Sequence, residues 1–340
     1  MNKKLIAAAI TAAVVAAPAA FAESVVYGKF HTSIDKVDFE DGTDNYQVNS
    51  RASRLGFKGS EDLGNGLKAI YQAEFSVQTD GNDGGVGQDG GDGWGGQRNT
   101  FIGLAGDWGT FLVGRHDTPA KVAFYASGNE RLGDSVIDLN RGNTINASNG
   151  RQGIGVFSEY RADNAIAYVS PSFGGFTVAA AAVPGEDGNG GAEDDGLADH
   201  WSVGAMFNSN GLKASVGYQS TEVADVEQEV FQVGASMTMN AFSIGAQYED
   251  TQNYGQVDDQ DYTAWALTGK FTFGNNAVSL VWTDAEADDA YDQTGWGLAA
   301  EHNFSKRTKV YAAYAANEVD YDGGDQFDDD VFSLGMIHDF

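Results

Sequence analysis

Carboxylates dominate the side chains of this sequence that could do chemistry. Asp and Glu number 49 against 20 Lys and Arg, the formal net charge is −29, and there is no cysteine. Nucleophilic catalysis needs a serine, a histidine and an orienting polar group, and no candidate trio can be placed, so we do not expect an enzyme. No acid spacing is specific for a metal ion, and we expect no cofactor. The acidic balance favours attraction of cations and argues against nucleic acid as a partner.

Two basic residues are set apart by the alternation of the sequence around them. Lys29 and Arg54 each fall on the opposite face from the apolar residues beside them. A charge facing lipid at mid-depth of a membrane strand would cost roughly 2–4 kcal/mol. If these segments cross a membrane, both side chains are therefore expected on the inner, wet face. By the same parity Arg51 falls on the outward face.

The segment that would position such residues is the last one, Val331–Phe340. Its even-numbered positions give one largely apolar face that ends on the aromatic Phe340. A terminal strand left unpaired would be an exposed sheet edge, which folded proteins avoid or cover. Its natural partner is the first strand after the N-terminal segment, residues 24–36. Pairing the two would close the sheet into a barrel.

Nearly every other ordered-looking segment alternates as well. The segments run about ten to thirteen residues, which suits a tilted membrane crossing, and their inward-type residues are glycine, serine, glutamine and charged residues. Such residues would make a poor core but a good aqueous lumen, and short connections alternate with long acidic ones. We therefore predict an all-β fold, a 16-stranded antiparallel transmembrane β-barrel. Its strands are expected at residues 24–36, 46–58, 66–79, 97–106, 109–116, 159–171, 175–184, 199–208, 211–221, 228–240, 241–251, 260–273, 276–285, 292–304, 307–318 and 329–340.

One connection is far longer than an ordinary hairpin loop. Residues 117–158 separate the fifth and sixth strands, and loops of this length are usually functional. The loop carries apolar residues that a solvent-exposed loop would not need: Val122, Phe124, Tyr125, Leu132, Val136, Ile137 and Leu139. We expect this third long loop to fold inward and pack on the lumen wall. Residues 153–158 could instead form a short extra strand.

The N-terminal residues 1–22 differ from the rest. Lys3 and Lys4 precede an apolar run from Leu5 to Val15, and Ala20-Phe21-Ala22 resembles a signal-peptidase site. We interpret residues 1–22 as a signal peptide and residues 23–340 as the barrel domain. The alternative, a transmembrane anchor, is disfavoured because the apolar run is short for a membrane span. Cleavage would remove two lysines and no acids, taking the net charge from −29 to −31.

Several strings in the sequence resemble the general diffusion porins of Gram-negative outer membranes, especially the neisserial and vibrio-like branch. Their order and spacing extend over the whole mature chain, and they are Val26–Lys29, Ser53–Gly59, Gly66–Gln72, Gly109–Arg115, Asn164–Phe173 and the terminal Phe340. The resemblance implies a trimeric, passive outer-membrane channel for small hydrophilic solutes and ions. It also implies a third loop that bends into the pore.

Position by position, the resemblance implies a charged constriction. The basic wall would be Lys29, Arg54, Arg98 and Arg115, and the acids that face it would be Glu74, Glu130, Asp134 and Asp138. The loop departs from the family, because Glu130–Asp134 replaces the usual proline-glutamate-phenylalanine-glycine string. Opposed charges would create a transverse field that orients charged and dipolar solutes. Alternatively, the arginines only hold the loop in place; both roles are compatible.

The expected function is therefore an outer-membrane porin with moderate cation selectivity, surrounded by outer-membrane lipid and by two further copies in a homotrimer. One alternative is a substrate-specific channel, which should show a run of aromatic residues along the lumen, and none is evident. The other is a secreted β-rich adhesion protein, which would need an apolar inner face on every strand. The acids in the long loops, around the expected channel entrance, favour cations, whereas the basic wall favours anions. We expect the effect of the acids to be the larger one.

Overall fold

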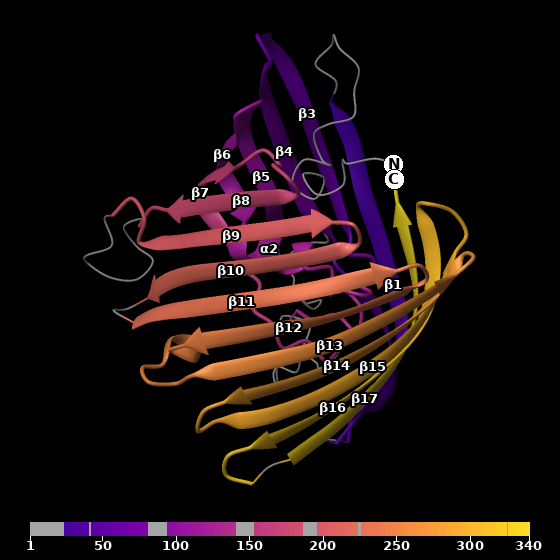
Figure 1. Cartoon of the computed structure of the whole chain (residues 1–340). Helices are drawn as coiled ribbons and strands as arrows, with labels where there is room; N and C mark the ends of the chain where they lie inside the picture. Colours follow the sequence, from indigo (N-terminus) through magenta and orange to yellow (C-terminus); the bar gives the residue numbers. More distant parts are fainter. Residues whose placement is uncertain are drawn as a thin grey trace.

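The computed structural model describes residues 24–40, 42–80, 94–140, 153–185, 196–223, 226–324 and 326–340. The expected signal peptide, residues 1–22, lies outside these ranges. The described residues form a closed antiparallel barrel (Figure 1). Its strands are β1 Val25–Phe39, β2 Asp44–Ser50, β3 Arg54–Gly64, β4 Leu67–Val77, β5 Trp94–Gly106, β6 Gly109–Asp117, β7 Arg161–Val169, β8 Phe176–Val183, β9 His200–Ser209, β10 Leu212–Val223, β11 Val226–Met239, β12 Phe242–Gln252, β13 Tyr262–Phe273, β14 Asn276–Ala287, β15 Tyr291–Asn303, β16 Thr308–Tyr321 and β17 Gln326–Asp339.

The predicted closure by the last strand is confirmed. β1 pairs antiparallel with β17 from Lys29 opposite Asp339 to Phe39 opposite Asp329. The Phe340 N–H donates to the Gly28 carbonyl over 3.0 Å, and the Gly28 N–H donates to the Phe340 carbonyl over 3.1 Å. A Cβ on Gly28 would stand 2.4 Å from the Phe340 ring. The barrel therefore has no free edge at its seam.

Seventeen segments make sixteen strands, because β2 and β3 are two parts of one strand. Both pair with β1: Arg54 of β3 lies opposite Lys29, and Ser50 of β2 lies opposite Thr32. Three residues, 51–53, therefore lie opposite the two residues 30 and 31 of β1. The extra residue is a β-bulge, with Ala52 at a φ of 49°. It reverses the alternation, so Arg51 turns inward, where it is 4% exposed. The prediction of an outward Arg51 is wrong for this reason.

The two faces of the wall differ as the alternation predicts. Along β14, for example, Ser279 and Thr283 are buried on the inner side while Leu280 is exposed on the outer side. Tryptophans also lie on the outer face near the long-loop end, and Trp265 packs on Tyr248 with ring centroids 4.4 Å apart. Among the described residues, no helix has the length and apolar character that crossing a membrane would require.

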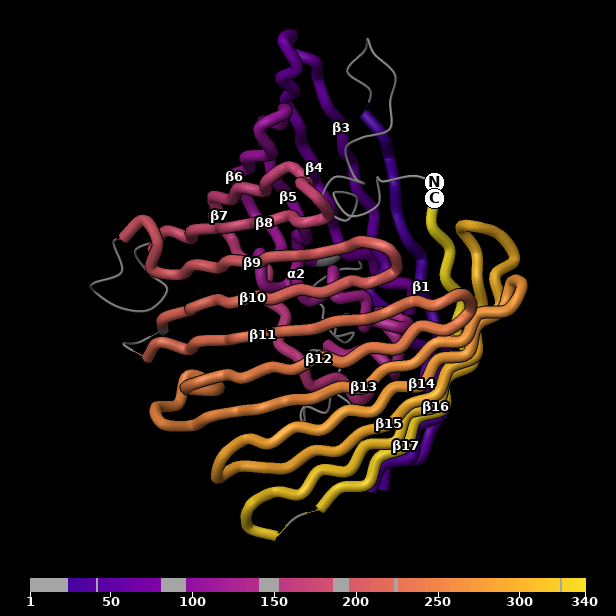
Figure 2. The backbone as a smooth tube through the Cα atoms, viewed as in Figure 1, coloured from indigo at the N-terminus to yellow at the C-terminus, as the bar shows by residue number. Residues whose placement is uncertain are grey.

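The third long loop folds into the barrel, as predicted. It begins with helix α2, Pro119–Ala126, whose first turn is capped by Thr118. In both backbone views α2 lies behind β9 and β10, on the inner side of the wall (Figures 1 and 2). Residues 153–158 form no extra strand; an isolated bridge joins Asn140 to Phe157. A short 3-10 turn, η2 at Tyr254–Gln256, is the other helical element of the described chain.

The loop packs where the wall lacks side chains. A Cβ on Gly217 of β10 would lie 2.8 Å from the Cα of Ala120, and one on Gly297 of β15 would lie 2.4 Å from the Cγ2 of Ile137. The loop's apolar residues are buried against the wall: Phe124, Leu132, Val136, Ile137, Leu139, Ile154, Val156 and Phe157. Close packing and apolar burial thus hold the loop inside the barrel.

Candidate functional site

The tip of the third loop is tied to the basic wall through one carboxylate. Asp134 Oδ2 lies 2.6 Å from Lys29 Nζ and 2.9 Å from Arg54 Nη2. Lys29 and Arg54 are register partners on β1 and β3, so both side chains leave the wall at one level. Asp134 has a φ of 60°, a conformation that non-glycine residues rarely adopt. Two cations on one acid anchor the tip on this side of the lumen.

A second charged pair lies on the neighbouring strands. Arg98 Nε donates to Glu74 Oε1 over 2.7 Å, and the Tyr27 hydroxyl donates to Glu74 Oε2 over 2.9 Å. Tyr27 reaches across β3 because Gly56 has no side chain, and a Cβ there would meet the Tyr27 ring at 2.6 Å. Three residues of the expected basic wall, Lys29, Arg54 and Arg98, therefore form two adjacent ion-pair groups with Asp134 and Glu74.

Arg115 has different contacts. Its Nη1 lies 2.5 Å from Asp163 Oδ1 on β7, and its Nε donates to the carbonyl of Gln97 over 2.8 Å. Asp163 is largely exposed. The structure thus pairs Arg115 with an acid of the adjacent strand and does not bring it to Asp134.

Glu130 and Asp138 brace the loop itself. Glu130 Oε2 accepts from the Leu139 N–H over 3.2 Å, and Asp138 accepts from the backbone N–H groups of Asn140 and Asp134. Burial raises the pKa of Glu130 to about 7. Burial, together with the Glu130 carboxylate, also raises the pKa of Asp138. Both acids are therefore less charged than free carboxylates at neutral pH.

Asp134 behaves in the opposite way. Burial by itself would raise the pKa of Asp134, but Lys29 and Arg54 outweigh it and hold that pKa well below its usual range. Among the three loop acids of the expected site, Asp134 is thus the one that stays ionised against the basic wall. The opposed charges of Asp134 and the basic wall can create a transverse electric field, and the loop tip can limit the size of the solutes that pass.

Several further ion pairs were not predicted, and two groups of them contain Arg51 and Glu301. Arg51 Nη2 lies 2.6 Å from Asp35 Oδ2. Glu301 accepts from Lys270 over 2.5 Å and from Lys309 over 2.9 Å. Alternation places the Glu301 group inward on β13, β15 and β16, so the signal was present in the sequence. For Arg51, the β-bulge reverses the alternation, so the sequence pattern does not indicate that this side chain faces inward.

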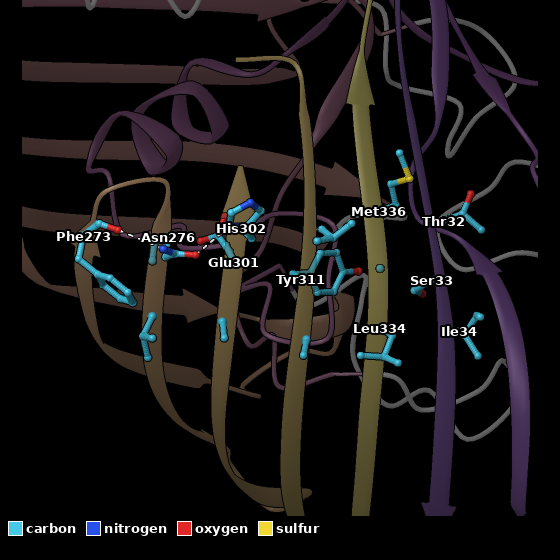
Figure 3. Close-up of a pocket in the computed structure, with 16 residues that line it drawn as sticks. Thr32, Ser33, Ile34, Phe273, Asn276, Glu301, His302, Tyr311, Leu334 and Met336 are labelled. Atoms are coloured by element: carbon cyan, nitrogen blue, oxygen red, sulfur yellow. Dashed lines mark hydrogen bonds between the residues drawn. The ribbon is translucent and has the colours of Figure 1, made fainter. Parts of the chain in front are cut away.

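The described residues contain no group of three or more side chains that could hold a metal ion. His302 lies near the short-turn end of β15, and its Nδ1 contacts Asn276 Oδ1 at 2.8 Å (Figure 3). His338 pairs in the same way with Thr308 over 2.8 Å. Both contacts are local to neighbouring strands.

Comparisons with known proteins agree with this architecture. A family model described as Gram-negative porin matches residues 8–323. The major outer membrane protein P.IB of Neisseria meningitidis is 28% identical over 371 residues, covering all of both chains. An anion-selective porin from Comamonas acidovorans superposes with a TM-score of 0.71 at 21% identity, over 94% of this chain and 100% of that one. OmpT of Vibrio cholerae, in its trimer form, superposes with a TM-score of 0.63 at 16% identity, over 94% and 99%.

Proposed function

Because this chain belongs to the Gram-negative porin family, we propose that its outer-membrane channel carries small hydrophilic solutes and ions with a moderate preference for cations. Porins are passive channels and not enzymes. The observation that supports the preference is that Asp134 and Glu74 neutralise much of the basic wall, since they bind Lys29, Arg54 and Arg98 directly.

Because the basic wall residues are neutralised, the acids at the channel mouth have the larger effect on ion selectivity. With the expected signal peptide removed, the chain carries −31, and its described long-loop turns include the exposed acids Asp258, Asp259, Asp261, Asp288 and Asp289. A potential of this sign concentrates cations and depletes anions. It weakens in salt, because the Debye length falls from about 10 Å at 0.1 M to about 3 Å at 1 M.

Reversal potentials across a potassium chloride gradient test this proposal. We expect a cation-selective sign at low salt that declines toward zero as the salt rises. Anion selectivity is the second candidate, because Lys29 and Arg54 share the single acid Asp134 and because the structurally similar Comamonas acidovorans porin is named anion-selective. An anion-selective reversal potential at low salt would reject the cation preference.

The assembly we propose is a homotrimer whose contact involves the first and last strands. A pocket on β1 and β13–β17 has small alanines, Ala300 and Ala312, among larger apolar side chains such as Ile34, Leu334 and Met336 (Figure 3). Small outward residues allow a neighbouring wall to approach closely. The similar OmpT barrel is described in a trimer form.

Mass measurement in mild detergent tests the trimer. We expect a trimeric mass for the wild type and a shift to monomers in Ala312→Trp, because the indole would fill the pocket. The matched control is Ala180→Trp, an exposed outward alanine on β8, which should stay trimeric. A monomeric wild type, or the same mass for both variants, would contradict the proposed contact.

A further inference from the structure

Basic residues of the second half of the chain are confined to one end of the barrel. From Ala214 to Phe340 the sequence contains four Lys and Arg residues, Lys270, Lys306, Arg307 and Lys309. Lys270 lies near the end of β13 at Phe273, and the other three lie in or beside the short turn between β15 and β16. All four are therefore at the short-turn end.

Three lysines of this end face the lumen and form what we call the basic shelf, Lys213, Lys270 and Lys309. Lys270 and Lys309 bind Glu301, and Lys270 Nζ also donates to the carbonyl of Arg131 in the third loop over 3.4 Å. Lys213 points toward the same loop, since a Cβ on Gly128 would lie 3.3 Å from its Nζ. Among the described residues, Glu301 is the one acid paired with these three lysines, so the shelf is net positive.

The opposite end of the same strands carries acids. Asp258, Asp259 and Asp261 lie between β12 and β13, and Asp288 and Asp289 lie between β14 and β15. All five are exposed, and neither connection contains a lysine or arginine. Ions thus meet a negative mouth on one side of the third loop and a positive shelf on the other.

We propose that this axial division of charge makes the channel rectify, so that more current flows when the long-loop side is positive. That polarity drives cations inward through the negative mouth and anions inward past the basic shelf. Both kinds of ion then accumulate at the constriction and raise its conductance. The reverse polarity drives cations and anions away from the constriction, which lowers the ion concentration there and therefore its conductance. The proposal rests on channel function and is independent of the sign of the overall selectivity.

Single-channel current–voltage curves in symmetrical salt test the proposal. Protein added to one chamber should insert with its short turns leading, because the charged loops resist crossing the bilayer, and a protease in that chamber verifies this by cutting the loops. At about 0.1 M salt we expect roughly 1.5-fold more current when the long-loop side is positive, and a ratio near one at about 1 M. A ratio of one or below at low salt would overturn the proposal. Absence of current at both polarities would contradict the channel function itself, and the rectification with it.

Two variants identify the shelf as the cause. Lys213→Gln removes an exposed charge, and Lys213→Arg is the matched control that keeps it. A second variant, Lys270→Gln/Glu301→Gln/Lys309→Gln, neutralises the triad without stranding the buried Glu301 carboxylate. We expect each neutral variant to lower the current ratio and Lys213→Arg to retain it. A ratio that is unchanged in both neutral variants would reject the proposal.

Discussion

Replacing Asp134 with asparagine shifts the ion selectivity of the channel toward anions. The substitution removes the one carboxylate that binds both Lys29 and Arg54 and leaves two unpaired cations beside the permeation path. Two unit charges about 4 Å apart in water interact by about 1 kcal/mol, so we expect the cation-to-anion permeability ratio to fall about fivefold. Reversal potentials of the two proteins in the same salt gradient measure this ratio.

The matched control for this prediction is Asp163→Asn. It makes the same chemical change beside an arginine, because Asp163 of β7 pairs with Arg115 of β6. We expect its permeability ratio to stay close to that of the wild type. Equal shifts in the two variants would mean that total charge, and not the position of Asp134, determines selectivity.

Deleting Gly128–Asn140 enlarges the conductance of the channel. This segment contains the Asp134 anchor and the buried residues Leu132, Val136, Ile137 and Leu139. Without it, the inner wall behind the loop becomes part of the aqueous lumen, and we expect an increase on the order of twofold in single-channel conductance. Heat-modifiable mobility in detergent confirms that the barrel still closes. An unchanged conductance in a closed barrel would place the loop outside the ion path.

A single substitution tests the packing of the third loop on the barrel wall without shortening the chain. Gly217→Ala puts a Cβ 2.8 Å from the backbone of α2, whereas Gly269→Ala meets nothing within 4 Å. Overpacking typically costs about 1–3 kcal/mol, so the first variant should unfold at lower urea concentration and the second should match the wild type. Equal midpoints would contradict the packing of α2 on the wall.

Strand positions were predictable because a membrane barrel requires alternation along every strand. Inner residues must suit water and outer residues must suit lipid, so the pattern persists from β1 to β17. One exception, among several register shifts in β1–β7, shows how the pattern can mislead. One extra residue at Arg51–Ser53 reverses the parity, and nothing in the alternation itself marks a bulge. Arg51 was therefore assigned to the wrong face, whereas Lys29 and Arg54, assigned to the inner face, contact Asp134 of the loop.

The contacts of the loop were harder to predict than its location. Apolar residues within it indicated inward packing, but three acids were equivalent candidates for the basic wall. Their roles differ because backbone N–H groups capture Asp138 and Glu130, whereas Asp134 projects from the tip toward Lys29. Such a choice depends on local turn geometry, which a single sequence does not specify.

The central claim is that the tip of the third loop lies in the ion path. The chain has no cysteine, so a single engineered thiol can report on that position without a background. Gly133→Cys places the thiol beside Asp134, where a Cβ would come no closer than 3.4 Å to its neighbours, and Ala180→Cys places one on the outer wall. Adding a charged thiol reagent during single-channel recording should lower the current of Gly133→Cys in discrete steps and leave Ala180→Cys unchanged. A current through Gly133→Cys that does not change after complete modification would contradict the account.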